Sequence, residues 1–421
     1  CLSRGLGDVY KRQIIDWVKK HKFIIFLFLF SFILRLLVVI TINTPVISDF
    51  KTMLDASLEL INNTSNYKSM PYFITWGYQM GHVIYQALLL SMINNVLFLK
   101  IINALTTSLT VVMIYIISKK LSNEKAAKTI SMIYSIFLFP LLLNTVLTNQ
   151  LLPMLLILIA INLWITYIPK KIFIAFPTGI LLAFSNILRS ETIVIMTAIL
   201  VYSLFSMLEK KDIKKISLSV LILIITYSSV MKLTSYTLEK TNISPSGLEN
   251  KNTAWKFLTG LNITTNGMYS AKDAEVYAYD EQKTKKELTK RIKEDYKNYP
   301  LLFLKKIKIV GLNSDLSWSI GYKGQQSTKL LTYLNQLFIY FFFIMALLSL
   351  IPLIKKKYNK VQVLITLIII IYFGVYLLIE VMPRYAYSIQ IFEAILTSIT
   401  LGYFLETINN KGREKNVKTR R

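Results

Sequence analysis

Long apolar runs constrain this chain more than any other feature. Of its 421 residues, 54% are hydrophobic and 17% are charged. Many of the runs approach the ~20 residues that a helix needs to cross a bilayer. We read ten of them, at 23–42, 97–118, 129–147, 151–168, 173–188, 192–208, 216–234, 330–354, 361–380 and 386–405. The sequence therefore predicts an all-α polytopic membrane protein with about ten transmembrane helices.

The basic residues support this count. If the ten runs alternate in direction, every basic cluster beside a short connection falls on one side of the membrane, which the positive-inside rule assigns to the cytoplasm. The clusters are Lys19/Lys20, Lys119/Lys120 with Lys125 and Lys128, Lys170/Lys171, Lys210/Lys211 with Lys214/Lys215, Lys355 to Lys357, and the tail from Lys411 to Arg421. We expect a multi-pass protein of the cytoplasmic (inner or plasma) membrane with both termini in the cytoplasm.

The net charge of +26 has the same origin. Its bases lie in short clusters between apolar runs, where they face an anionic leaflet of membrane lipids. No nucleic-acid partner is therefore expected.

The runs also divide the chain into parts. Residues 1–13 resemble a translated sequencing adaptor and are set aside as an artefact. Residues 14–234 form an N-terminal membrane domain with a first outer loop at 43–96, in which the aromatic segment from Trp76 to Tyr85 is typical of an interfacial or re-entrant helix. Residues 329–406 form the last spans, and 407–421 form a basic cytoplasmic tail.

Residues 235–328 form a hydrophilic region between the seventh and eighth spans, on the outer side. We interpret it as a cap over the membrane domain, with a solvated linker as the alternative. From 271 to 308 its pattern is helical with a break at Pro300, and four apolar residues recur at helical spacing. We expect those four to pack on the membrane domain: Ile292, Tyr296, Tyr299 and Phe303.

Acidic residues gather just after the first span, at 44–60. Pro45 ends the preceding helix, and Ser48 is a good N-cap for a new one. Asp49 then lies in the first turn, at the edge of an apolar stripe.

The other acids of this stretch differ from Asp49. Asp55 and Glu59 take the polar face of the helix, where Lys51 can pair with Asp55 four residues on. Asp49 is either a structural charge at a helix N-terminus or a catalytic base.

Two arginines lie at span ends on the same predicted side, in Arg189-Ser190-Glu191 and in Glu380-Val381-Met382-Pro383-Arg384-Tyr385. A guanidinium matches phosphate geometry bidentately, so both could neutralise a departing phosphate while Asp49 accepts a proton from an attacking hydroxyl. The alternative is that each arginine is an interfacial anchor, or pairs with Glu191 or Glu380.

Several familiar signatures are absent from the sequence. It contains no Walker loop, no GxGxxG after a strand, no HExxH and no serine-hydrolase elbow. His21 and His82 are the only histidines, neither has a partner at ligand spacing, and both are expected to be interfacial. We predict no metal site and no cofactor.

The order of these features resembles the GT-C glycosyltransferases of bacteria, in particular the protein O-mannosyltransferase and aminoarabinose-transferase type (glycosyltransferase family 39). The matching residues are Ser48-Asp49-Phe50 with Ala56, Trp76-Gly77 with Tyr85, Lys100-Ile101-Ile102-Asn103, Asn186-Ile187-Leu188-Arg189-Ser190-Glu191, Gly260-Leu261-Asn262 with Gly267 and Tyr269, and Glu380 with Arg384-Tyr385.

This resemblance implies a GT-C helical bundle whose first outer loop carries the catalytic Asp49. The donor would be a sugar on a polyprenyl phosphate, transferred with inversion to a glycan, lipid or protein hydroxyl in an extracytoplasmic active site. Arg189 and Arg384 would bind the donor phosphate, and five further residues would bind substrate: Glu191, Glu380, Tyr385, Trp76 and Tyr85. The chain departs from the family where relatives often carry an acid after the third span, since Asn149-Gln150 stands there.

Two other functions stay open. A cell-surface polysaccharide polymerase or ligase is also many-spanned, and would depend more on outer arginines than on a first-loop Asp. A lipid-linked sugar flippase or other transporter usually shows internal repeats and broken spans near mid-membrane, and no convincing repeat is present here.

Overall fold

The computed structural model describes the backbone of residues 2–209, 212–320, 325–355 and 359–418, and the side chains of 21–209, 212–320, 328–355 and 359–408. The adaptor-like start, the pairs Lys19/Lys20 and Lys210/Lys211, Lys356/Lys357 and the basic tail therefore lie outside the described side chains. Within the described part the chain is helical, and extended pairing is limited to one isolated bridge between Trp76 and Asn250.

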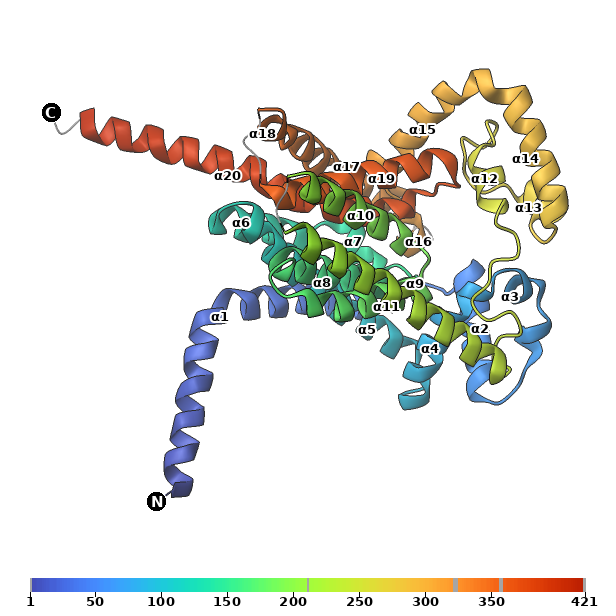
Figure 1. Cartoon of the computed structure of the whole chain (residues 1–421), viewed down its shortest axis with the longest axis horizontal. Coiled ribbons are helices and arrows are strands. Elements are labelled where there is room, and N and C mark those ends of the chain that lie inside the picture. Colours follow the sequence, from blue (N-terminus) through green and yellow to red (C-terminus); the bar gives the residue numbers. More distant parts are fainter. Residues whose placement is uncertain (1, 210–211, 321–324, 356–358, 419–421) are drawn as a thin grey trace.

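Six helices of the described chain are long and apolar enough to cross a membrane (Figure 1). They coincide with the first, second, seventh, eighth, ninth and tenth predicted spans. They are α1 (Leu2–Thr41, of which His21–Thr41 qualifies), α5 (Val96–Leu121), α11 (Ile213–Lys240), α17 (Gln325–Leu348) continued by α18 (Leu350–Ile354), α19 (Lys360–Leu378) and α20 (Ala386–Lys418).

The other four predicted spans are shorter or broken. Three of them form the apolar helices α8 (Leu151–Tyr167), α9 (Ala175–Leu188, preceded by the 3₁₀ turn η3, Ile172–Ile174) and α10 (Thr192–Leu208). The run at 129–147 is not one helix, because the backbone turns extended at Phe137 and divides it into α6 (Glu124–Ser135) and α7 (Leu138–Leu143). Length and apolar composition give six candidate spans among the described residues, and the count of ten stays a prediction.

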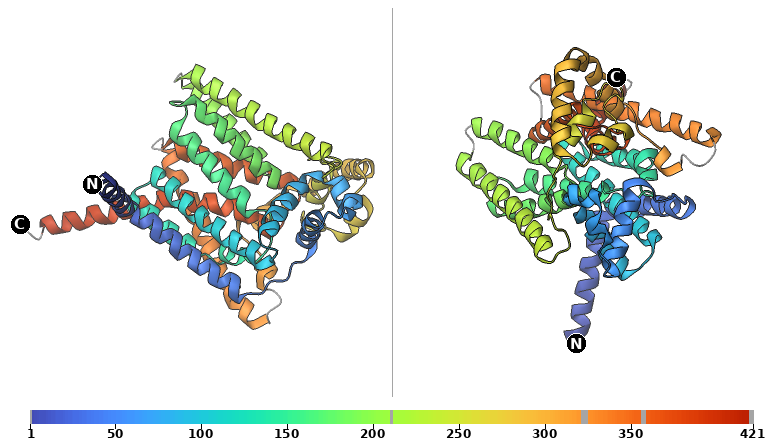
Figure 2. Two further views of the ribbon diagram at one scale, coloured as in Figure 1. Left: turned by 90° about the horizontal axis from the view of Figure 1, so that it is seen from below. Right: turned by 90° about the vertical axis from the view of Figure 1, so that its right-hand side faces the viewer.

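The connections between helices collect at the two ends of the bundle. At one end the side chain of Asn359 donates to the carbonyl of Lys120 (2.8 Å), and Lys360 pairs with Glu209. The N- and C-termini lie toward this end, whereas the helices between α11 and α17 lie at the opposite end (Figure 2). Connections that the sequence assigns to opposite sides of the membrane therefore lie at opposite ends of the bundle.

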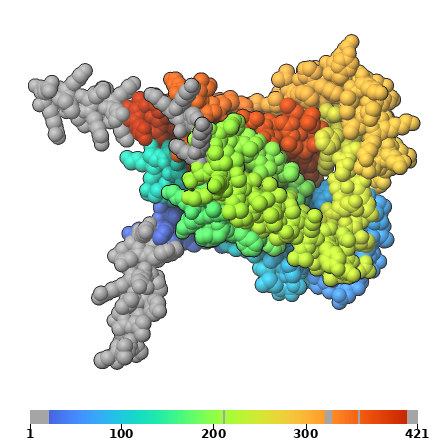
Figure 3. Space-filling model, viewed as in Figure 1, coloured from blue at the N-terminus to red at the C-terminus, as the bar shows by residue number. Residues whose placement is uncertain are grey.

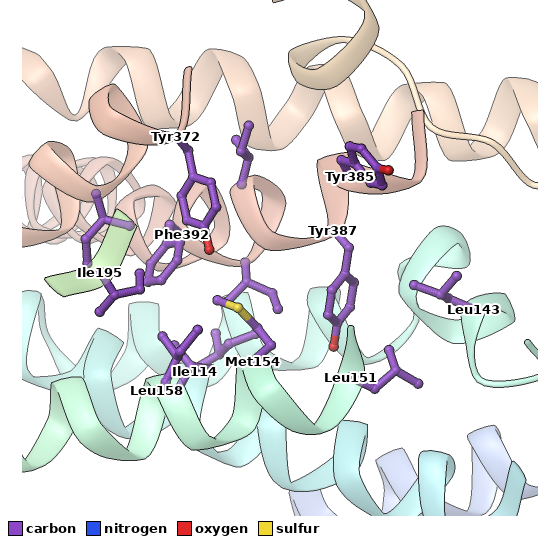
Figure 4. Close-up of a cluster of buried hydrophobic side chains, with 14 of the residues drawn as sticks. Ile114, Leu143, Leu151, Met154, Leu158, Ile195, Tyr372, Tyr385, Tyr387 and Phe392 are labelled. Carbon is purple, nitrogen blue, oxygen red and sulfur yellow. The ribbon is translucent and has the colours of Figure 1, made fainter. Parts of the chain in front are cut away.

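The interior of the bundle contains a large aromatic and aliphatic core and a few buried ionisable residues, among them Arg35 of α1, Lys100 of α5 and Glu393 of α20. Arg35 is fully buried and donates to the hydroxyl of Ser31 (2.5 Å) and the carbonyl of Ser135 (3.3 Å). It thus faces the protein, as the cost of a charge in lipid requires. Figure 4 shows Tyr387 of α20 directed toward Leu151 of α8, across the middle of this core.

Residues between α11 and α17 form the short helices α12 (Trp255–Gly260), α13 (Ala271–Tyr277), α14 (Glu281–Asp295), α15 (Tyr299–Gly311) and α16 (Ser317–Ile320). In Figure 1 the segment α12–α15 arches over the end of the bundle that also carries α2 (Ser48–Ile61) and α3 (Pro71–Thr75). We call α12–α15 the cap. Its helices α13 and α14 are joined by Arg291, whose guanidinium binds both oxygens of Asp273 (2.8 and 2.9 Å).

The prediction of which cap residues pack on the membrane domain is wrong in part. Ile292 and Tyr296 are 44% and 58% exposed, whereas Leu302 and Lys306 are buried. The cause is the 3₁₀ turn η4 (Tyr296–Asn298), which interrupts the helical period so that one stripe does not continue from α14 into α15. Pro300 lies in the first turn of α15, where proline is well tolerated, and so begins a helix.

Candidate active site

Helix α2 positions Asp49 at the end of the bundle that the cap covers. Its N-cap is Ile47, with extended backbone and no side-chain hydrogen bond, so the prediction that Ser48 is the N-cap was wrong. The helix begins one residue earlier than expected, and Ser48 takes a left-handed φ of 57°. Asp49 remains in the first turn and is exposed, without an ion-pair partner among the described residues. The predicted pair of Lys51 with Asp55 is confirmed (2.9 Å).

Two adjoining cavities lie beside Asp49. The larger has a volume of about 600 Å³ and the smaller about 180 Å³. Figure 3 shows the cap, in yellow and orange, meeting the first outer loop, in blue, at this end of the molecule. The cavities have a common wall formed by Asp49, Tyr78, Gln79, Lys256, Glu380, Arg384 and Tyr385.

The larger cavity is markedly aromatic. Three of the five tryptophans of the chain line it. Its rings come from the first outer loop, the cap, the segment before α17 and the turn before α20: Tyr72, Trp76, Tyr78, Trp255, Tyr269, Tyr279, Trp318 and Tyr385. The predicted substrate residues Trp76 and Tyr385 are therefore both in its wall.

The smaller cavity holds Arg189, which lies in the turn between α9 and α10. Its guanidinium pairs with Glu191, donates to the side-chain oxygen of Asn149 (2.7 Å) and lies 5.2 Å above the ring of Tyr385. Glu191 attracts the guanidinium strongly enough to outweigh burial, so the pKa of Arg189 is raised and its charge is retained. The predicted pair with Glu191 is formed, and Asn149 helps to orient the arginine.

Arg384 is held differently. It belongs to the 3₁₀ turn η5 (Pro383–Tyr385), and its guanidinium lies 4.6 Å from the centre of the Trp318 ring and 5.4 Å from that of Phe50. The alternative pairing with Glu380 is not formed. Among the described residues Arg384 has no ion-pair partner, so aromatic rings position a charge that is left for a ligand.

Glu380 is paired instead with Lys256 of α12, which the sequence reasoning missed. The ammonium of Lys256 lies 3.1 Å from Oε1 of Glu380, and the hydroxyl of Tyr385 donates to the same oxygen (3.0 Å). Burial alone would raise the pKa of Glu380, but Lys256, Tyr385 and Arg384 outweigh it and hold the pKa below its usual range. Oε2 is buried and without a hydrogen-bond partner among the described residues, so this carboxylate keeps an acceptor for a ligand.

A buried lysine fixes the backbone next to Glu380. Lys306 of α15 is fully buried and donates to the carbonyls of Gly260 (2.7 Å), Leu377 (2.9 Å) and Ile379 (2.7 Å). These carbonyls end α12 and α19, where helices leave such groups unsatisfied. Burial lowers the pKa of Lys306 to about 7. A Cβ added to Gly260 would lie 2.2 Å from the carbonyl carbon of Ile379, so only glycine permits this approach.

Two predicted residues lie elsewhere. Tyr85 of α4 (Met80–Met92) does not line either cavity, and its ring packs 5.8 Å from that of His82. His82 is buried within the protein (5% exposed). Burial, with Arg189 nearby, lowers the pKa of His82 to about 3, so the imidazole is neutral.

The acids of the site are dispersed. In the part of the chain that the structure describes, no group of three or more His, Cys, Asp or Glu side chains lies close enough to hold a metal ion. Glu191 pairs with Arg189 and Glu380 with Lys256, whereas Asp49 lines both cavities together with Arg384. The chemistry that this arrangement offers is therefore that of a carboxylate base beside an anion site.

No family model matches the chain, and no curated protein matches its sequence. Its structure is similar to that of the Archaeoglobus fulgidus oligosaccharyltransferase in three solved forms. The form tethered to an acceptor peptide with the NVT sequon and the apo form both give a TM-score of 0.53 at 13% identity, covering 94% and 95% of this chain and 51% and 52% of that one. The form with Zn and sulfate gives 0.51 at 14% identity, over 92% of this chain and 49% of that one.

The likeness defines the fold. The chain has the GT-C-type membrane fold of the oligosaccharyltransferase, as the sequence resemblance predicted, and spans about half the length of that protein.

Proposed function

We propose that the protein is a glycosyltransferase of the cytoplasmic membrane. It transfers a hexosyl or pentosyl group from a polyprenyl phosphate to an acceptor hydroxyl on the extracytoplasmic face. One observation carries the proposal: the carboxylate of Asp49 and the guanidinium of Arg384, which has no ion-pair partner among the described residues, line the same cavity wall. The GT-C-type fold supports it, since the similar protein is an oligosaccharyltransferase crystallised with an acceptor peptide.

Asp49 serves as the general base. The acceptor oxygen attacks the anomeric carbon while its proton passes to the carboxylate of Asp49. The bond between that carbon and the phosphate oxygen breaks from the opposite face, and its electron pair stays on the phosphate. One displacement of this kind inverts the anomeric centre.

The arginines serve the leaving group. Among the described residues, no carboxylate pairs with Arg384. Arg189, oriented by Glu191 and Asn149, adds a second positive charge from the smaller cavity. A guanidinium binds phosphate oxygens through parallel N–H bonds, and this interaction strengthens as negative charge develops on the phosphate. Glu380 and Tyr385 bind substrate in the same wall.

The two ends of the bundle support the proposed localisation. The cavities lie at the end opposite the described basic connections at Lys120 and Lys360. With those connections in the cytoplasm, the site faces outward, where nucleotide sugars are not supplied and a lipid-linked donor is required.

A transfer assay tests the proposal. Membranes that contain the protein are incubated with a panel of polyprenyl-phosphate sugars, and new glycosidic bonds and released polyprenyl phosphate are measured for wild type and Asp49→Asn. We expect at least one donor to be consumed by wild type and none by a normally accumulated variant. Full transfer by Asp49→Asn contradicts the assignment, as does movement of lipid-linked sugar across sealed vesicles without a new bond.

A further inference from the structure

We propose that the acceptor is a glycan, whose sugar rings stack on an aromatic wall formed by Tyr72, Trp76 and Tyr279. The inference rests on the proposed function, because it names the acceptor class of the same site. The alternatives are a peptide and a lipid hydroxyl, which demand different surroundings from the cavity.

The three rings contact one another in series and come from two distant parts of the chain. The ring centroids of Tyr72 and Trp76 are 5.1 Å apart with planes at 83°, and those of Trp76 and Tyr279 are 5.4 Å apart with planes at 45°. Tyr279 is 54% exposed, and Tyr269 beside it in the same cavity is 53% exposed. Both tyrosines are thus accessible in the cavity wall, where the C–H face of a sugar can pack on an aromatic ring.

Polar groups surround these rings as hydroxyl-rich ligands require. Asp49, Gln79 and Glu275 line the same cavity, and the buried hydroxyl of Tyr72 has no hydrogen-bond partner among the described residues. Burial raises the pKa of Tyr72, Tyr269 and Tyr279, and the charge of Asp49 adds to the rise in each. The base and the aromatic wall are therefore within electrostatic reach of each other, as an acceptor bound on that wall needs.

The cavity does not suit a lipid acceptor. An acyl chain needs an aliphatic groove. The aliphatic lining of this cavity is limited to Met382 and three alanines, at 271, 274 and 278, and its other residues are aromatic or polar.

Nor does it suit a peptide bound along a strand edge. Peptides often bind by adding a strand, which needs free backbone N–H and C=O groups. Beside the aromatic wall this edge is already paired within the chain, since the amide of Lys251 donates to the carbonyl of Thr75 (2.8 Å) and Trp76 bridges to Asn250.

Two variants test the wall, Trp76→Leu and Tyr279→Leu, with Tyr296→Leu as the matched control. Tyr296 is 58% exposed in the same cap but lines neither cavity. Because Tyr279 is more than half exposed, its replacement should leave the fold intact even if Trp76→Leu does not. The probes are cello- and chito-oligosaccharides, a short serine- and threonine-rich peptide, and a lipid alcohol, each offered with the donor found for wild type.

We expect oligosaccharides to be the used acceptors. Tyr279→Leu should raise the KM for the oligosaccharide about tenfold, equal to about 1.4 kcal/mol. The KM for the donor should change much less than the KM for the oligosaccharide, and Tyr296→Leu should behave as wild type in both. Use of the peptide or lipid but not of any oligosaccharide overturns the acceptor class while leaving the proposed function intact.

A binding measurement separates the two failures. Oligosaccharides are titrated into the purified wild-type protein without donor, and quenching of tryptophan fluorescence is recorded. Binding that Tyr279→Leu weakens supports the aromatic wall even if no donor is consumed, an outcome that would contradict only the proposed function. Absence of binding by every oligosaccharide, or equal binding by Tyr279→Leu, overturns the inference.

Discussion

Replacement of Lys306 by methionine tests how the cap and the membrane helices hold the site. Methionine keeps much of the apolar stem but removes the ammonium that three carbonyls accept from, those of Gly260, Leu377 and Ile379. A buried carbonyl left without a partner costs about 1–3 kcal/mol, so three cost about 3–9 kcal/mol.

Part of this loss is recovered, because the wild type also bears the cost of a buried charge, which is why burial lowers the pKa of Lys306 to about 7. We therefore expect Lys306→Met to lower the free energy of unfolding by about 2–4 kcal/mol. Release of the Ile379 carbonyl also frees the backbone that carries Glu380, so the transfer rate should fall about tenfold, the effect of 1.4 kcal/mol on a barrier.

The assay is a thermal melt in detergent, with hydrogen exchange followed at residues 377–381 and transfer measured on the same sample. Lys305→Met is the control, because Lys305 is exposed on the same helix. A Lys306→Met protein that melts, exchanges and transfers as Lys305→Met does would refute the reasoning.

Three further predictions concern substitutions at Lys256, Arg384 and Asp273. Lys256→Met leaves the buried carboxylate of Glu380 without its cation, so the pKa of Glu380 should rise and the acid limb of the pH–rate profile should move to higher pH; an unmoved limb would argue that the pair does not act in transfer. Arg384→Gln should raise the KM for the donor about tenfold with an unchanged melting temperature, since that guanidinium has no described ion pair; a donor KM equal to that of wild type would remove Arg384 from the phosphate site. Asp273→Asn should loosen the cap and speed its proteolysis; in the wild type Arg291 lowers the pKa of Asp273, so this contribution is present above pH ~4 and is lost as the pH falls through the folded pKa.

The apolar runs predict much of the fold, because helix length in a membrane is fixed by bilayer thickness. The six long helices follow the predicted runs within a few residues at most ends, apart from α1, which begins at Leu2, and α20, which continues to Lys418. The prediction of one spanning helix at 129–147 was wrong, because apolar composition does not reveal the extended backbone at Phe137 that divides the run. The prediction of Ser48 as the N-cap of α2 was wrong for a related reason, since a residue's side chain alone does not decide where a helix begins.

Five of the predicted site residues lie close to the ends of apolar runs and come together in the structure. Asp49, Arg189, Glu191, Arg384 and Tyr385 all line the smaller cavity. The predicted alternation of the spans would bring every second connection, and these residues with it, to the same end of the bundle.

The pairing within the site was not predictable. Glu380 and Arg384 are four residues apart, but the chain between α19 and α20 is not α-helical, so the spacing does not bring them together. The partner of Glu380 is Lys256, 124 residues away. The available signal was a lysine inside the apolar segment Trp255-Lys256-Phe257-Leu258, where an unpaired charge would be costly.

The most direct test of the central claim uses Asp49 against its neighbour Asp55. Both acids lie on α2, but Asp55 pairs with Lys51 away from both cavities. Purified wild type, Asp49→Asn and Asp55→Asn are reconstituted in liposomes with the polyprenyl-phosphate donor that wild type consumes, and the rate of sugar transfer is measured at equal protein. We predict that Asp49→Asn loses about 10²- to 10⁴-fold in rate, as removal of a general base does, while Asp55→Asn transfers as wild type. Equal rates for Asp49→Asn and Asp55→Asn would contradict the account.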